Sequence, residues 1–254
     1  MELALGFAIA ALIAITGVGA GSITAPLLIL FLNVPAPLAI GTALAYAAVV
    51  KLVVVPVQMA RRQVVWRTLG VMLVAGVPGV LIGSEIFERV ARTPARNLWL
   101  YLALGLMIAL SSGWHIYRHF RPRAREAERR ARPLWLAAAM LPVGAEVGFS
   151  SSGAGALGTL ALMSLSPLDP ARIVGTDLAF GLCLALIGGS MHMAHGGVDF
   201  PLLAQLIAGG ILGALAGSGI APRIPSRVLR LVLSVWLLVM GLQLCWHALA
   251  QVRG

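Results

Sequence analysis

Long apolar runs without charge dominate this sequence and limit what it can fold into. Hydrophobic residues make up 59% of the 254 positions, whereas charged residues make up 11%. A water-soluble domain of ordinary composition carries about 25% charged residues, which its surface needs for contact with water. A helix that crosses the hydrocarbon core of a bilayer needs about 20 apolar residues. The sequence therefore predicts an all-α integral membrane protein.

Apolar segments of this kind follow one another along the whole chain. They are unbroken rather than alternating, which excludes membrane β-strands. They cover residues 3–33, 38–60, 68–87, 97–117, 134–166, 173–195, 200–221 and 228–250. An arginine-rich connector, 118–133, separates a first membrane repeat, 1–117, from a second, 134–254. We expect this connector to lie in the cytoplasm, where basic residues are attracted to anionic lipid headgroups.

The two groups of four segments are related by an internal repeat. Small residues recur in the same order at an offset of 134 positions. The matched sets are Gly19-Ala20-Gly21 with Gly153-Ala154-Gly155, Gly41-Thr42 with Gly175-Thr176, and Gly76, Gly79, Gly83 and Ser84 with Gly210, Gly213, Gly217 and Ser218. An ordered series at one offset indicates a duplicated unit.

The first segment of each repeat is interrupted by glycine and serine, at 16–22 and at 150–155. Such a segment either crosses the membrane once or turns at its glycines and leaves on the side where it entered. In the second arrangement the two repeats are inverted. The side of the membrane with fewer basic loop residues then carries Arg89, Arg92, Arg96 and Arg253. The positive-inside rule favours this arrangement. It predicts six crossings, two re-entrant helical hairpins and both termini outside the plasma (inner) membrane of a bacterium.

Broken helices at matching positions of inverted repeats are typical of transporters, and the breaks usually mark the substrate site. The second piece of each hairpin would begin near Gly21 or Gly155, with its first N–H groups unpaired in the helix. Such a helix end carries partial positive charge and suits an anion. We therefore expect a small anion to bind near the bilayer midplane, where the two hairpins meet.

Several motifs resemble those of a known family. Residues 17–22, GVGAGS, are followed by Pro26-Leu27-Leu28 and by AIGTAL at 39–44, and the second half carries IVGTD at 173–177. In these motifs the chain resembles the TauE/SafE family of sulfite exporters and related anion permeases. The resemblance implies transport of sulfite or an organosulfonate such as sulfoacetate. Ser151 stands where the first half has Gly17, and Leu160 where it has Pro26, so the shape of the second hairpin and the substrate stay open.

Hydroxyl groups and glycine backbone at the predicted breaks can hold an oxyanion without a strong charge. The substrate-binding candidates of this kind are Gly19, Gly21, Ser22, Thr24, Thr42, Ser151, Ser152, Gly153, Gly155 and Thr176. Thr42 and Thr176 stand out because the pair is duplicated beside glycine. Other roles are open: serine is common in turns, and threonine often bonds back to its own helix.

Lys51 is the one lysine of the chain and lies inside an apolar segment. An ammonium group at this depth costs about 2.5–3.5 kcal/mol on insertion scales, so it is expected to face a cavity or a partner. We therefore add Lys51 to the substrate-binding candidates. The alternative is that its long stem extends to the cytoplasmic interface. Its equivalent in the second repeat is Ala185, which makes any site at Lys51 asymmetric.

Glu146 and Asp177 are the candidates for proton coupling. Glu146 lies just before the serine run of the second hairpin, where its carboxyl group could carry a proton or pair with Lys51. Asp177 follows Gly175-Thr176, and it could instead be an acid in the first turn of a helix, where the helix dipole favours it.

His192 and His195 share a helix face and could bind a metal, but no third ligand lies near them in sequence, so we expect no metal site and place both histidines on the surface. Two other functions remain as alternatives: a cation or metal permease, and a membrane-embedded lipid-modifying enzyme. The sequence carries no nucleotide-binding or catalytic motif, so neither catalysis, nor a cofactor, nor nucleic-acid binding is expected. The expected partners are the small anion and the lipid bilayer, and a homodimer is one possible assembly.

Overall fold

The described part of the chain is helical throughout. The computed structural model describes residues 2–16, 20–91, 97–120, 131–152, 155, 157–220 and 226–253. These residues form α1 (Glu2–Thr16), α2 (Ala20–Phe31), α3 (Ala36–Ala60), α4 (Trp66–Ala91), α5 (Asn97–Phe120), α6 (Pro133–Ser150), α7 (Leu157–Leu165), α8 (Pro170–Ala194), α9 (Phe200–Ile220) and α10 (Ser226–Arg253). The predicted apolar segments correspond to these helices, with α1 and α2 in the first segment and α6 and α7 in the fifth.

Several of these helices are long and apolar enough to cross a membrane. Among the described residues there are six, namely α3, α4, the 98–117 part of α5, α6, α8 and α9. In α10 the apolar part, Leu231–Trp246, is shorter. Large apolar side chains such as Val74, Leu110 and Leu212 are exposed on the outer surface, each more than 60% accessible. A multi-pass integral membrane protein explains such a surface, because lipid covers it.

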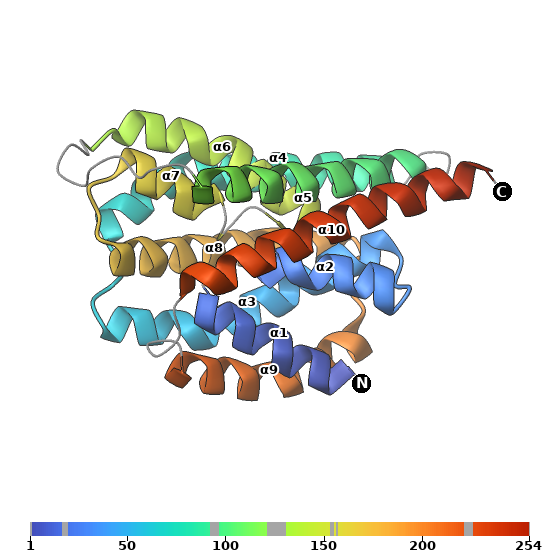
Figure 1. The fold of residues 1–254 in the computed structure, drawn as a ribbon, viewed down its shortest axis with the longest axis horizontal. Coiled ribbons are helices and arrows are strands. Elements are labelled where there is room, and N and C mark those ends of the chain that lie inside the picture. The colour runs from blue at the N-terminus through green and yellow to red at the C-terminus, as the bar shows by residue number, and fades with distance from the viewer. Residues whose placement is uncertain are drawn as a thin grey trace.

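The helices run roughly along one common direction (Figure 1). The beginning of α1 and the end of α10 lie at the same end of the molecule, and the start of α6 lies at the other. α1 leads inward and α2 returns to the same end, whereas α6 and α7 do so from the opposite end. A hydrogen bond from the backbone N–H of Arg132 to the carbonyl of Leu165, 3.0 Å long, closes this second pair at its base. We call α6, α7 and the chain between them the second hairpin.

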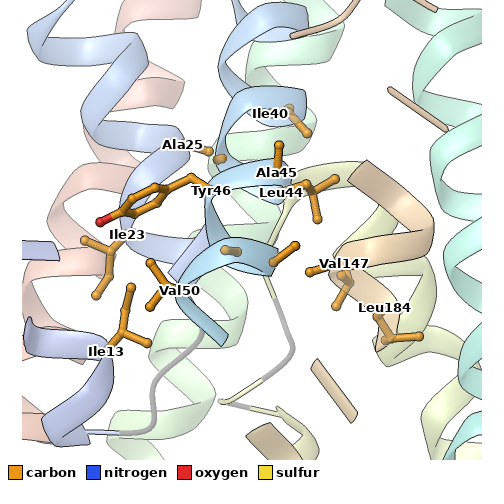
Figure 2. Packing of buried hydrophobic residues seen from close by; sticks show 14 of the residues in the cluster. Ile13, Ile23, Ala25, Ile40, Leu44, Ala45, Tyr46, Val50, Val147 and Leu184 are labelled. Carbon is orange, nitrogen blue, oxygen red and sulfur yellow. The ribbon is translucent and has the colours of Figure 1, made fainter. Parts of the chain in front are cut away.

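α3 and α8 lie at the centre of the bundle and pack against each other. Both helices carry small or apolar residues on nearly every side, which is the pattern of a helix surrounded by other helices. Tyr46 of α3 is fully buried, and its hydroxyl donates a hydrogen bond to the carbonyl of Gly6 in α1. Figure 2 shows the ring of Tyr46 beside Ile23, with Val147 and Leu184 on the opposite side of α3.

Glycines allow the outer helices to approach the hairpins closely. α4 packs along α6, where a methyl group on Gly83 would overlap the carbonyl of Ala145. α9 packs along α1, where a methyl group on Gly217 would overlap the carbonyl of Ala11. These contacts correspond to each other at the offset of 134. Small residues at such crossings let membrane helices gain close van der Waals contact.

The same correspondence extends to large side chains. The ring of Phe180 in α8 fills the space beside Gly76, and the ring of Tyr46 in α3 fills the space beside Gly210. Gly210 lies 134 positions after Gly76, and Tyr46 lies 134 positions before Phe180. Contacts between the two halves of the chain therefore recur in pairs.

Candidate functional site

The buried acidic, basic and histidine side chains lie in α3, α4, α6 and α8. Among the described residues they are Lys51, Glu88, Glu146, Asp177 and His192. Their equivalents in the other repeat are uncharged: Ala185, Pro222, Leu12, Ala43 and Gln58, in the same order. Both halves of the chain therefore contribute buried charged groups, but at positions that do not correspond at the offset of 134. Burial of ionisable groups at membrane depth generally marks a functional region.

Lys51 and Asp177 form the first group, between the two central helices. Lys51 is only 4% exposed, and it interacts electrostatically with Asp177 rather than with Glu146. One carboxylate oxygen of Asp177 accepts a hydrogen bond of 2.7 Å from the hydroxyl of Thr159. The other lies so close to Gly158 that a methyl side chain there would overlap it.

Asp177 is the eighth residue of α8, and therefore not in the first turn of its own helix. Its carboxylate instead lies at the first turn of α7, the second piece of the second hairpin. A negative charge at this position is stabilised by the unpaired N–H groups and the dipole of that helix. The structure thus places an acidic side chain at a helix end that the sequence had predicted to bind an anionic ligand.

Glu146 forms the second group, near the end of α6. The hydroxyls of Ser111 in α5 and of Ser152 lie near its carboxyl group, and the Ser111 hydroxyl donates to the carbonyl of Ile108. Its Oε1 atom is buried and makes no hydrogen bond within the described residues. This carboxyl group has a free acceptor position inside the bundle, where a proton or a ligand donor would satisfy it.

The turn after α6 contains the predicted serine run. Ser150 directs its hydroxyl back to the carbonyl of Glu146, as buried serines in membrane helices often do. Ser151 ends the helix in the left-handed conformation, with φ of 61°, and its hydroxyl is buried without a hydrogen-bond partner within the described residues. Gly155 has φ of 101°, which glycine adopts readily and other residues rarely.

Glu88 and His192 form a third group, which we did not predict. His192 is fully buried, so the expectation that both histidines lie on the surface was wrong for His192, although it holds for His195. Its Nδ1 lies 3.1 Å from Oε1 of Glu88 in α4, and its Nε2 lies 3.0 Å from the carbonyl oxygen of Gly148 in α6. The burial of Glu88 could have been predicted from its position in the sequence. Glu88 follows the buried residues Gly76, Val80 and Ser84 of α4 at intervals of four residues.

The predicted threonines have structural partners. The hydroxyl of Thr42 accepts a hydrogen bond from the N–H of Asp199, just before α9, and that of Thr176 accepts one from the N–H of Val65, just before α4. Both bonds are 3.0 Å long. The structure therefore gives both residues a role in joining helices, and contact with a ligand stays a prediction.

The first hairpin contributes less that can be described. Thr24 is fully buried within α2, and Gly21 and Ser22 belong to the first turn of that helix. Gly19 and Gly153 lie outside the described residues. The structure brings Lys51 and Asp177 together and Glu146 and Ser152 together, but it does not join these groups to the residues of the first hairpin.

This arrangement defines a class of protein. Six long apolar helices, glycine-lined crossings and a buried charged centre are the features of a multi-pass membrane transporter. A family model described as Sulfite exporter TauE/SafE matches residues 2–244. The chain therefore belongs to the TauE/SafE family of membrane transporters, as the sequence motifs predicted.

A curated relative supports the same conclusion. The protein named "Probable membrane transporter protein YjnA" of Bacillus subtilis (strain 168) is 30% identical over 247 residues, which cover 94% of this chain and 97% of that protein. No solved structure matches the chain.

Proposed function

We propose that the protein is a secondary permease that moves a small anion across the plasma (inner) membrane of a bacterium, with sulfite or an organosulfonate such as sulfoacetate as the first candidates. The observation that carries this proposal is the buried ammonium group of Lys51. It is 4% exposed, and it interacts electrostatically with Asp177, α3 and α8 being packed against each other. A buried cation in a membrane transporter needs an anionic partner, and a substrate anion is such a partner.

The substrate and Asp177 would compete for Lys51. When both are ionised, the charges of Lys51 and Asp177 sum to zero, and the carboxylate would repel an added anion. Protonation of Asp177 would remove that repulsion and leave Lys51 available. Under this proposal one proton accompanies each anion, with Asp177 as the leading coupling group and Glu146 as a second candidate.

The proposed membrane arrangement consists of two inverted repeats with re-entrant hairpins and the anion near the bilayer midplane. Three observations support it. α1–α2 and α6–α7 enter the bundle from opposite ends (Figure 1). The bond from Arg132 to Leu165 closes the base of the second hairpin. The glycine contacts of α4 with α6 recur between α9 and α1.

The hydroxyls near the break of the second hairpin would contribute to the same site. Ser151 has a buried hydroxyl that makes no hydrogen bond within the described residues, and Ser152 lies beside Glu146. Neutral donors can hold an oxyanion and still release it, which a transporter must do in every cycle. Glu146 belongs to this hairpin, and Asp177 and His192 contact it through Thr159 and Gly148, which supports a site beside the second hairpin.

Flux measurements on the purified protein in vesicles test the proposal. Uptake of sulfite, sulfoacetate, sulfate, lactate and a divalent metal would be compared under an imposed membrane potential and under an imposed pH gradient. We expect selective movement of a sulfur oxyanion or sulfonate, which the variant Lys51→Ala loses. Movement of the metal alone would favour a cation permease. Movement of none of these solutes, by a preparation that unfolds cooperatively, would contradict the proposal.

A further inference from the structure

The contact between Glu88 and His192 requires a proton between the carboxyl group and the Nδ1 atom. The carbonyl oxygen of Gly148 can only accept hydrogen bonds, so the Nε2 atom that lies 3.0 Å from it must carry hydrogen. The hydroxyl of Ser84 donates to the same oxygen, at 3.4 Å. Neutral histidine holds one ring hydrogen. With that hydrogen on Nε2, the Nδ1 atom facing Glu88 is a bare acceptor.

A bare Nδ1 cannot face an ionised carboxylate at 3.1 Å without repulsion, since both atoms would then be acceptors. One further proton resolves the contact. It resides either on Glu88, which then donates to a neutral ring, or on Nδ1, which then donates to the carboxylate. In both cases the pair has no net charge, and a donor faces an acceptor across the 3.1 Å contact.

The surroundings hold the imidazole in place. Phe87 packs edge-on against the ring, with centroids 5.1 Å apart, and against Phe149, with centroids 5.6 Å apart. The backbone of Gly41 in α3 lies against the β-carbon of His192. The ring thus joins α8 to α4 through Glu88 and to α6 through Gly148.

Other titratable groups near the pair are few. On α4 they are Glu85 and Arg89, which pair with each other at the exposed surface. On α6 the titratable residue is Glu146, whose carboxyl group lies near Ser111 and Ser152. His195 and Asp199 follow on the chain of α8: His195 is exposed, and Asp199 accepts a hydrogen bond from the N–H of Leu202. On α3, no titratable residue lies within 36–45.

We propose that Glu88 and His192 form a proton-binding site that clamps α8 and the end of α6 to α4. The side chain of His192 is fully enclosed and that of Glu88 is 11% exposed, so the proton exchanges with solvent through Glu88. Loss of the proton leaves a negative charge against the Nδ1 lone pair and weakens the clamp. Because the end of α6 carries the turn of the second hairpin, the clamp deepens the proposed transport function: it makes movement of that hairpin depend on pH.

Thermal unfolding of the purified protein across a range of pH tests the clamp without any substrate. The variant Glu88→Gln replaces the carboxyl group with an amide that donates to Nδ1 permanently. We expect the unfolding temperature of the wild type to fall as pH rises and that of Glu88→Gln to change much less. Glu85→Gln, at an exposed position of the same helix, should follow the wild type. A Glu88→Gln profile identical to the wild type, or a wild-type profile without pH dependence, would overturn the proposal.

A second variant keeps the test usable if Glu88→Gln does not fold. His192→Gln places at this position the residue that Gln58 provides in the other repeat, and its amide can still donate to the carbonyl of Gly148. This variant lacks the imidazole that shares a proton with Glu88. The pH dependence of its unfolding temperature should therefore also differ from that of Glu85→Gln. Identical profiles for His192→Gln and Glu85→Gln would count against the clamp.

Exchange of sulfoacetate across vesicles at equal pH on both sides provides the link to transport. We expect the pH dependence of exchange by Glu88→Gln to differ from that of the wild type, while Glu85→Gln matches the wild type. If the wild type exchanges no anion, the proposed function fails, while the unfolding measurements still decide whether the clamp exists. If exchange by Glu88→Gln keeps the wild-type pH profile, the clamp has no part in transport and the proposal is wrong.

Discussion

The hydroxyl of Thr42 in α3 accepts a hydrogen bond from the backbone N–H of Asp199, 3.0 Å away, at the point where α9 begins. Thr176 in α8 accepts the matching bond from Val65, where α4 begins. In both pairs the threonine and the N–H belong to different halves of the chain. The N–H groups at a helix start have no partner within the helix. Each threonine therefore satisfies one of them and joins a central helix to an outer one.

Removing either threonine hydroxyl should destabilise the protein. Thr42→Val and Thr176→Val keep the shape of the side chain but leave a partly buried N–H group without its acceptor, which costs roughly 1–2 kcal/mol. Thermal unfolding in detergent would measure the loss. Thr42→Ser and Thr176→Ser keep the hydroxyl and serve as controls. Valine variants that unfold at the wild-type temperature would contradict the joining role.

The glycine at position 83 should not tolerate even a methyl group. In Gly83→Ala the new carbon would overlap the carbonyl of Ala145 in α6, and such overpacking costs about 1–3 kcal/mol. Gly70→Ala in the same helix is the matched control, because nothing lies within 4 Å of the added carbon. We expect the unfolding temperature to fall in Gly83→Ala and to stay constant or rise in Gly70→Ala. Equal unfolding temperatures for the two variants would show that α4 and α6 are not packed this closely.

Replacing Lys51 should remove anion transport and leave the fold intact. In Lys51→Ala the substrate loses a charge-assisted contact of about 1.5–3 kcal/mol, which corresponds to a roughly ten- to hundredfold weaker interaction. The neighbouring side chain of Leu52 is half-exposed at the outer surface, so Leu52→Ala is a control for insertion and folding. Flux in vesicles at equal protein content measures the effect. Unchanged flux in Lys51→Ala would remove Lys51 from the site.

Neutralising Asp177 should change affinity and turnover in opposite senses. Asn in its place can still accept the hydrogen bond from Thr159, but it no longer competes with the substrate for Lys51. We expect Asp177→Asn to bind the anion more tightly and release it more slowly, so that both KM and kcat for flux decrease. Asp169→Asn, at an exposed N-cap of the same helix, is the control. An increase in KM for Asp177→Asn would contradict the proposed competition.

Labelling of single cysteines decides between inverted and parallel repeats. Glu2→Cys and Arg61→Cys would be made in a background in which Cys183 and Cys245 are replaced by alanine. In the inverted arrangement position 2 faces outside and position 61 faces the cytoplasm, so a reagent that cannot cross the membrane labels only the first in intact cells. In the parallel arrangement both positions face the cytoplasm. Equal protection of both sites would therefore reject the inverted repeats.

Much of the fold could be predicted because lipid imposes a simple rule on sequence. Six of the long apolar runs form one helix each, and the first and fifth runs form two each. Backbone hydrogen bonds must be satisfied inside the segment at membrane depth, which favours helices. α1 ends at Thr16 and α2 begins at Ala20, and the glycines between them lie outside the described residues. Pairing of helices could be inferred less directly: matching glycines indicate close packing, but they do not identify the helix that each one contacts.

The site was predicted less completely, because the burial of a charge depends on helix rotation and tertiary contacts. Lys51, Glu146 and Asp177 were recognised because they interrupt apolar runs. Glu88 lies at the end of a run beside Arg89, where charges are usually at the surface, and its burial follows from the close contact of α4 with α6. The partner of Lys51 could not be decided from sequence either, since Glu146 and Asp177 are both acidic and only their positions in space separate them.

The contacts between the halves recur in pairs, but the buried charges do not, and this difference limits how the halves can be exchanged. A chain assembled from two copies of residues 1–117 would keep the glycine crossings and the threonine bonds. It would carry Lys51 and Glu88 twice and would have none of the acidic and histidine partners that the second half provides. Two copies of the second half would lack the lysine altogether. The two halves are thus alike as scaffolds and complementary in charge, so that only their combination in one chain yields buried groups that neutralise one another.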